Sequence, residues 1–204
     1  SSDSQASSVG DRSSGFLATV PAPPASLQHR LLAWYQREGR VLPWRQTRDP
    51  YAIWISEIML QQTQVKTVIP YYDRWLRALP TVHALAADQQ TVLKLWEGLG
   101  YYARARNIHQ SAQIIVAEHQ GQFPATLAQA IALPGIGRTT AGGILSAAFD
   151  QPLAILDGNV KRVLARLVAL PVPPAKAIAH LWQLSATLLD AAHPRDFNQA
   201  VMDL

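Results

Sequence analysis

The sequence contains no cysteine in its 204 residues. This absence excludes disulfide bonds, thiolate metal sites and a cysteine nucleophile, and it leaves the redox compartment undetermined. The six histidines are scattered, with no pair at ligand spacing and no acidic cluster beside them. The sequence therefore predicts no metal site, and we expect this chain to bind no cofactor by itself.

Long apolar runs are also lacking. Charged or amide side chains interrupt every apolar stretch before it reaches the roughly 18 to 20 residues that a membrane-spanning helix needs, so we expect no membrane association. Sustained alternation of apolar and polar residues is absent too, which predicts an all-α fold. The 49% of hydrophobic residues suits one or two small domains with a full core.

Acidic side chains are outnumbered, with 14 Asp and Glu against 18 Lys and Arg, which gives a net charge of +4. The sequence pI is near 9.6. A basic balance favours an acidic partner, with nucleic acid the first candidate. The inference is mild, because many basic proteins bind nothing acidic.

Residues 1–26 are rich in Ser, Ala and Pro, and this composition predicts a disordered tail. Ser26 is a candidate cap for the first helix, and Asp49-Pro50 is a typical helix start. Helices are expected over residues 27–38, from Pro50 through Glu57, over 65–79, from Thr81 and from Asp88, over 101–119, 127–133, 138–149, 158–168 and 175–189, and from Phe197 onward.

Glu57 is the single carboxylate in a segment, residues 53–64, that is apolar nearly all the way round. A helix with this pattern is normally buried. Because a buried ionised carboxylate is costly, Glu57 has either a structural partner or the task of holding a proton. The second interpretation predicts that burial raises its pKa.

The stretch from Leu133 to Thr140, LPGIGRTT, combines two closely spaced glycines with the start of a helix. Such a turn exposes backbone N–H groups and places the positive end of a helix beside them, which favours a phosphate seat. A short Gly-x-Gly alone fits an ordinary helix–helix turn equally well. Arg138 and the basic helix with Lys161 strengthen the phosphate interpretation, although that helix alone would indicate a solvated face.

Asp157 precedes another expected helix, where Asp is a preferred N-cap. Capping is compatible with catalysis, because the helix N-terminus keeps the carboxylate ionised. Two carboxylates in opposed environments are the usual arrangement for breaking a glycosidic bond, so Glu57 and Asp157 form a candidate pair. Gln61-Gln62 and Tyr101-Tyr102 lie at turns where planar side chains can wedge into a base stack.

Six blocks carry a resemblance to a known family: Leu42-Pro43-Trp44, residues 54–65 (WISEIMLQQTQV), 95–107 (LWEGLGYYARARN), 133–142 (LPGIGRTTAG), 155–166 (ILDGNVKRVLAR) and 197–204 (FNQAVMDL). In this order they resemble the MutY-type adenine DNA glycosylases of the endonuclease III-like helix-hairpin-helix superfamily. The resemblance runs from about Leu31 to Leu204.

The resemblance implies an all-α fold of two lobes with the active site in the cleft between them. Residues 49–156 would form a six-helix barrel that carries the hairpin, and residues 27–48 and 157–204 the second helical lobe. It also implies base excision repair of double-stranded DNA: adenine opposite 8-oxoguanine or guanine is flipped out and its N-glycosidic bond is hydrolysed. We expect a monomer, cytoplasmic and associated with the nucleoid if bacterial, and nuclear or mitochondrial if eukaryotic.

The resemblance also assigns roles. Glu57 would be the general acid, Asp157 would stabilise the cationic sugar or bond to it transiently, and Asn159 would be the polar partner of Asp157. The expected DNA-binding residues are Gln62 and Tyr101 as wedges, and Pro134, Gly135, Gly137, Arg138, Thr139 and Lys161. The expected adenine-pocket residues are Trp44, Arg45 and Leu60.

Thr139 stands where the bifunctional branch of the superfamily has a nucleophilic lysine, which predicts a glycosylase without efficient strand cleavage. Most of the family carries a four-cysteine [4Fe-4S] loop just beyond the FNQAVMDL stretch, so we expect a fragment of a longer, cluster-containing protein. Two alternatives stay open. One is a glycosylase of the same superfamily for mismatched thymine or oxidised pyrimidines, and the other is a helix-hairpin-helix module that binds DNA without chemistry.

Overall fold

The computed structural model describes residues 25–204, so residues 1–24 of the expected disordered tail lie outside it. The described residues contain no strand, and the expected all-α fold is confirmed. The helices are α1 (Ala25–Glu38), η1 (Pro43–Arg45), α2 (Pro50–Leu60), α3 (Val65–Ala78), α4 (Val82–Ala87), α5 (Gln89–Trp96), α6 (Ala103–Glu118), α7 (Leu127–Ile131), α8 (Arg138–Phe149), α9 (Gly158–Leu167), η2 (Pro174–Lys176), α10 (Ile178–Leu188) and α11 (Pro194–Asp203).

Four helices begin at side-chain caps that the sequence indicates. The side chains of Asp49, Thr81, Asp88 and Asp157 each accept a backbone N–H from a residue two or three positions later. Each such cap stabilises its helix by about 1 kcal/mol. The caps fix where α2, α4, α5 and α9 start, and two of these helices carry the candidate catalytic carboxylates.

Several expected helix boundaries differ from the structure: the helix expected over 101–119 begins at Ala103, because Tyr101 has a φ of +51°, and the one expected over 127–133 ends at Ile131. The first helix begins at Ala25, so Ser26 lies inside it and does not cap it. The helix expected over 175–189 is a 3-10 turn at Pro174–Lys176 followed by α10, because Ala177 leaves the helical conformation between them. The last helix begins three residues earlier than expected, at Pro194, whose fixed φ suits the first turn.

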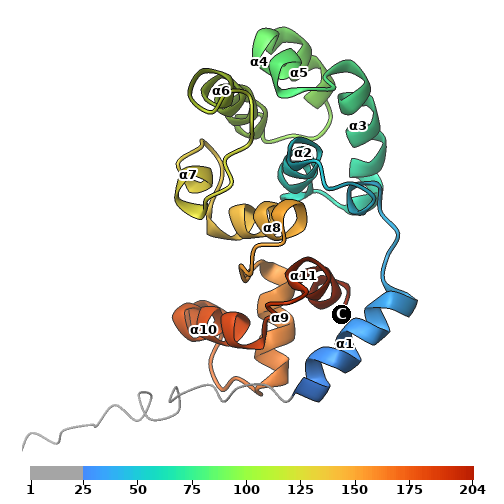
Figure 1. Cartoon of the computed structure of the whole chain (residues 1–204), viewed down its shortest axis with the longest axis vertical. Coiled ribbons are helices and arrows are strands. Elements are labelled where there is room, and N and C mark those ends of the chain that lie inside the picture. Colours follow the sequence, from blue (N-terminus) through green and yellow to red (C-terminus); the bar gives the residue numbers. More distant parts are fainter. Residues whose placement is uncertain (1–24) are drawn as a thin grey trace, which may run out of the picture.

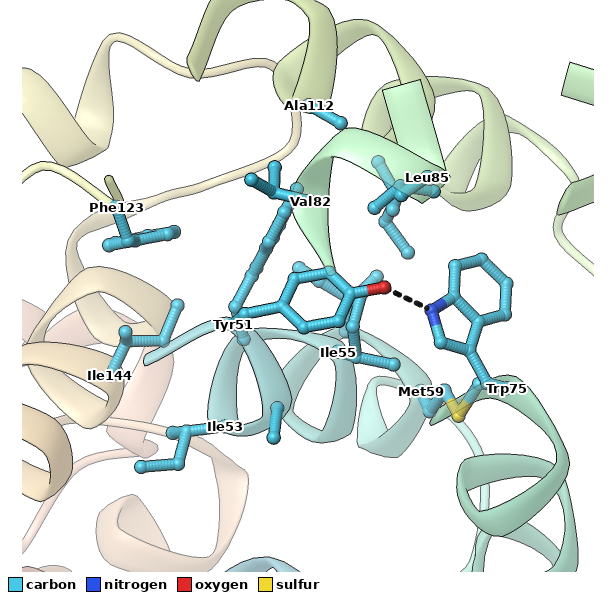
Figure 2. Close-up of a cluster of buried hydrophobic side chains, with 14 of the residues drawn as sticks. Tyr51, Ile53, Ile55, Met59, Trp75, Val82, Leu85, Ala112, Phe123 and Ile144 are labelled. Atoms are coloured by element: carbon cyan, nitrogen blue, oxygen red, sulfur yellow. Dashed lines mark hydrogen bonds between the residues drawn. The ribbon is translucent and has the colours of Figure 1, made fainter. Parts of the chain in front are cut away.

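The first lobe is built around α2, which lies among α3 to α8 (Figure 1). Its core includes Ile55 and Met59, both fully buried. Figure 2 shows Tyr51 at the centre of this cluster, where its hydroxyl accepts the indole N–H of Trp75 at 3.1 Å. The same hydroxyl donates to the carbonyl of Leu79 at 2.6 Å. After Pro50, the only residues of α2 that are not buried are Glu57 and Leu60.

The second lobe combines the two ends of the described chain, α1 with α9, α10 and α11. Helices α1 and α11 pack side by side there (Figure 1). The two hydrophobic cores depart from the expected domain boundaries at a few residues. Leu42 and Trp44, expected in the second lobe, pack in the barrel core, and Ile155 and Leu156, expected in the barrel, pack in the core of the second lobe. The boundaries themselves stay a prediction. Among the described helices, none has both the length and the hydrophobicity to cross a membrane.

Candidate active site

A cavity of about 360 Å³ lies between the two lobes. This volume is within the range of small-molecule pockets. Seven of the expected site residues line this cavity: Trp44, Arg45, Glu57, Leu60, Thr139, Asp157 and Asn159. The cavity thus brings both candidate carboxylates, from α2 and from the start of α9, to one space.

Glu57 points from α2 toward α8, where Gly143 leaves room for it. A Cβ atom at Gly143 would lie 3.1 to 3.2 Å from the carboxyl atoms of Glu57. Burial, reinforced by the negative charge of Asp157 and opposed by Arg45, raises the pKa of Glu57 to about 7. No described residue donates a hydrogen bond to this carboxyl group. The expected rise in pKa is confirmed, and the group can hold a proton near neutral pH.

Asp157 caps α9 through its Oδ1, which accepts the N–H of Val160 at 2.8 Å. Thr139 supports the residue before it, because its hydroxyl accepts the N–H of Leu156 at 3.3 Å. Asn159 lines the same cavity, but its Oδ1 accepts a bond from Arg162 at 3.3 Å. Within the described residues no hydrogen bond joins Asn159 to Asp157, so the expected partnership between them stays a prediction.

Arg45, which lines the cavity, is bound by Asp203. Its two terminal nitrogens bind the two carboxylate oxygens at 2.8 Å, and both side chains are almost fully buried. Arg40 adds a third nitrogen at 2.9 Å from Asp203 Oδ1. Burial would raise the pKa of Asp203, but hydrogen bonds from Arg45 and Arg40 outweigh it and lower that pKa to about 2.

Helix α11 contributes two polar side chains that the sequence did not single out. Arg195 donates to the carbonyl oxygens of Thr47, Ala147 and Arg45 at 3.0, 2.8 and 2.6 Å. Asn198 donates from Nδ2 to the carbonyl of Leu153 at 2.9 Å and to the hydroxyl of Ser146 at 3.2 Å. These bonds fasten the wall of the cavity to the barrel.

Gly143 and Asp203 were also missed. The available signal for Gly143 was a pair of adjacent glycines inside a helix, which usually has a packing or functional reason. Asp203 and the two polar residues of α11 lie in or next to the last of the six blocks, as polar residues on a helix that is otherwise buried.

The hairpin between α7 and α8 has the expected tight turn. Gly135 has a φ of +78°, and a Cβ there would lie 3.1 Å from the Cβ of Asn107. The carbonyl of Pro134 accepts the hydroxyl of Ser111 at 3.0 Å, and Gly137 precedes the first turn of α8. Arg138 is exposed but stacks on the ring of Trp182 at 3.8 Å. Its guanidinium therefore also ties the hairpin to α10.

The two expected wedge residues, Gln62 and Tyr101, are exposed and lie at turns with left-handed backbone. Their φ angles are +59° and +51°, values that are uncommon for residues other than glycine. Both turns are bound by one side chain, Arg104, which the sequence did not indicate as functional. The contribution of these residues and of the hairpin, including Thr139 and Lys161, to DNA binding stays a prediction at this point.

Residues 55–186 match the family described as the HhH-GPD superfamily of base excision DNA repair proteins. The chain belongs to this superfamily. The fold expected from the six blocks is thereby confirmed, and the described HhH-GPD lobes contain the hairpin that the name denotes.

Curated relatives named adenine DNA glycosylase are similar to this HhH-GPD chain. The protein of Rattus norvegicus is 47% identical over 90% of the chain and 38% of its own length. That of Homo sapiens is 47% identical over 85% of the chain and 34% of its own length. That of Buchnera aphidicola subsp. Baizongia pistaciae is 46% identical over 85% of the chain and 50% of its own length. The chain thus spans between a third and a half of these relatives.

Solved structures agree on the fold. A thermostable thymine-DNA glycosylase aligns with a TM-score of 0.77 and 28% identity, over 87% of this chain and 83% of that one. Endonuclease III in a trapped covalent complex with DNA aligns with a TM-score of 0.73 and 20% identity, over 86% of this chain and 81% of that one. The second likeness concerns the HhH-GPD fold alone.

The residues of this HhH-GPD chain do not fit a [4Fe-4S] cluster. Such a cluster is held by four cysteine thiolates, and the sequence has no cysteine. No group of three or more His, Asp or Glu side chains in residues 25–204 is placed to hold a metal ion.

Proposed function

We propose that this chain is the catalytic part of an adenine DNA glycosylase that acts in base excision repair on adenine mispaired with 8-oxoguanine or guanine. The observation that carries the proposal is Glu57, a carboxyl group with a pKa of about 7 that faces a base-sized cavity opposite Asp157. The adenine DNA glycosylases among the curated relatives support the choice of adenine.

In the proposed reaction the target adenine leaves the duplex and enters the cavity. Glu57 donates its proton to the departing base, and the N-glycosidic bond breaks with both electrons going to the base. Asp157, at the N-terminus of α9, stabilises the cationic sugar until water adds to it and the proton released from that water returns to the Glu57 carboxylate. Trp44, Arg45 and Leu60 line the cavity and would contact the base, and Asn159, which lines the same cavity, would lie beside the sugar.

The proposed partner is double-stranded DNA. The hairpin from Pro134 to Thr139 offers backbone N–H groups and the start of α8 to a phosphate, and Lys161 adds positive charge on α9. Gln62 and Tyr101 would fill the gap left by the flipped nucleotide. Thr139 has no amine, and its hydroxyl is already bonded to the N–H of Leu156, so we expect base removal without strand cleavage.

A single-turnover assay tests the proposal on duplexes with A opposite 8-oxoguanine, A opposite G and T opposite G. We expect base loss from adenine only, with strand breaks that appear only after alkali. In Glu57→Gln, which cannot donate the proton, base removal should fall by at least about 100-fold. The matched control is Glu118→Gln, an exposed carboxyl on α6, which should keep the wild-type rate. Direct nicking, or full activity in Glu57→Gln, would contradict the mechanism.

The pH dependence of the same assay reports on the proton. Because the acid form of Glu57 is required and its pKa is about 7, the rate constant should be maximal below pH 7 and fall about tenfold per pH unit well above it. A rate constant that rises through neutral pH would indicate a general base in place of the acid.

A second candidate is a thymine-mismatch glycosylase, which the likeness to the thermostable thymine-DNA glycosylase favours. Base loss from T opposite G, with adenine left intact, would select it. If neither base is lost while duplex DNA is still bound, the chain is a binding module without chemistry.

A further inference from the structure

Arg104, on the first turn of α6, joins the two turns that carry Gln62 and Tyr101. Its Nη1 donates to the carbonyl oxygens of Ile58 at 2.8 Å and of Met59 at 3.2 Å, and also to that of Gln61. The bonds made by Nη1 therefore lie at the C-terminus of α2, directly before Gln62.

The other nitrogen of Arg104 reaches the second turn. Nη2 donates to the carbonyl oxygens of Leu99 at 3.3 Å and Gly100 at 3.4 Å, directly before Tyr101, and to the hydroxyl of Thr63 at 3.3 Å. The guanidinium also lies over the rings of Trp96 and Tyr101, at 5.0 and 5.7 Å from their centroids. One planar group thus sits between the two turns and bonds to both.

For a purely structural contact, this arrangement of Arg104 is energetically unfavourable. The guanidinium of Arg104 faces carbonyl oxygens and ring faces, its Nε is buried without a hydrogen-bond partner, and no described carboxylate pairs with it. The two residues next to its carbonyl partners, Gln62 and Tyr101, both have positive φ, a backbone conformation that is unfavourable for residues other than glycine. Such strain persists only where surrounding bonds hold it in place, and it is often functional.

We infer that Arg104 is a positioning residue that sets the spacing between Gln62 and Tyr101, so that both side chains enter the DNA duplex as one rigid wedge. The inference rests on the proposed glycosylase function and adds a residue that touches neither the base nor the sugar. A lysine cannot replace it, because a single ammonium lacks the two-sided fork of donors that reaches both turns.

The test compares Arg104→Met and Arg104→Lys with the matched control Arg106→Met. Arg106 is exposed on the same helix, two residues further on, and among the described residues its side chain makes no hydrogen bond to either turn. Each variant is assayed at saturating enzyme in single turnover, and the reaction amplitude gives the active fraction. One duplex has adenine opposite 8-oxoguanine, and the other has adenine opposite a tetrahydrofuran abasic analogue, so that no base pair has to be opened.

We expect Arg104→Met and Arg104→Lys to lose about tenfold or more in rate constant on the paired duplex, since small misplacements reduce rates by such factors. On the duplex with the abasic analogue the loss should be threefold or less, because the wedge has less to separate. The pH midpoint should not move, because Glu57 is untouched. An equal loss on both duplexes would indicate general damage to the site and would overturn the inference, as would wild-type rates in both variants.

A fluorescence binding experiment distinguishes failure of this inference from failure of the proposed function. A duplex carries a tetrahydrofuran abasic analogue in one strand with 2-aminopurine as its neighbour, and the fluorescence change on binding reports entry of the wedge. A wild-type signal that is lost in Arg104→Lys and kept in Arg106→Met would support the wedge even if the wild type removes no adenine. If the wild type removes adenine and all variants give the same fluorescence, the inference fails and the function stands. A wild type without either signal would overturn both.

Discussion

At the scale of single residues, the environment of Glu57 decides what the cavity can do. The carboxyl group is packed against Gly143, and within residues 25–204 the charges that act on its pKa are those of Asp157 and Arg45. The guanidinium of Arg45 donates two hydrogen bonds to the carboxylate of Asp203. Arg45 is thus prevented from forming an ion pair with Glu57, which would lower the pKa of the proposed acid.

Gly143→Ala tests the contact with Glu57. The added methyl would meet the carboxyl at 3.1 to 3.2 Å, so the acid must move by a few tenths of an ångström, and we expect the rate of base removal to fall by about tenfold. The free energy of unfolding should not fall, because alanine is a better helix former than glycine by about 1 kcal/mol. Single-turnover kinetics and urea denaturation measure the two effects.

Gly142→Ala is the matched comparison for stability. Its methyl would meet the backbone carbonyl of Ala154 at 2.9 Å, which cannot yield as a side chain can. We expect it to lower the free energy of unfolding by about 1 to 3 kcal/mol. A wild-type rate in Gly143→Ala would contradict the role given to that contact.

At the scale of elements, the sequence predicted most helices and the two carboxylate positions, because caps and apolar spacing are local signals. Asp49 and Asp157 are caps that can be read from the chain, and both are caps in the structure. Arg104 and Arg195 could not be found in this way. Most of their partners are backbone carbonyls of distant segments, which leave no pattern of side chains in the sequence.

The hairpin between α7 and α8 gives the prediction that belongs to this scale. Gly135→Ala forces a side chain onto a φ of +78° and toward the Cβ of Asn107, so the turn must distort. We expect duplex affinity to fall about tenfold, from strain of about 1 to 2 kcal/mol at the phosphate seat. Fluorescence anisotropy at several salt concentrations measures the affinity and the number of phosphate contacts.

Gly121→Ala provides the control for this variant. Gly121 also has a positive φ, +73°, and a Cβ there would approach His83, but it lies in the turn after α6 and outside the hairpin. It should lose stability and keep the affinity for DNA. Equal losses of affinity in both variants would show that the hairpin has no special part in binding.

At the scale of the whole molecule, buried polar bonds fasten α11 both to the barrel and to the segment around η1, which together wall the cavity. Asp203→Asn removes the charge that binds Arg45 and Arg40, and we expect the free energy of unfolding at pH 7 to fall by about 2 to 3 kcal/mol. The folded-state pKa of Asp203, about 2, lies below its ordinary value of 3.8, so this stabilisation is present above pH 3.8 and is lost as the pH falls through about 2.

Denaturation of Asp203→Asn and wild type across this pH range measures the effect, and the two curves should converge toward pH 2. The control is Asp150→Asn, which removes an exposed ion pair with Arg48. Because exposed pairs contribute 1 kcal/mol or less, that variant should differ little from wild type at any pH. A pH-independent gap for Asp203→Asn would mean that the carboxylate charge is not what binds the arginines.

The packing of α1 against α11 has a consequence for the order in which the molecule assembles. The barrel core comes from one continuous stretch between Leu42 and Ala147, so it can close as soon as that stretch has left the ribosome. Tyr35, in contrast, donates its hydroxyl to Gln199, 164 positions later, at 2.5 Å. During synthesis α1 therefore emerges before the barrel, whereas its partner α11 is among the last parts of the described chain to appear.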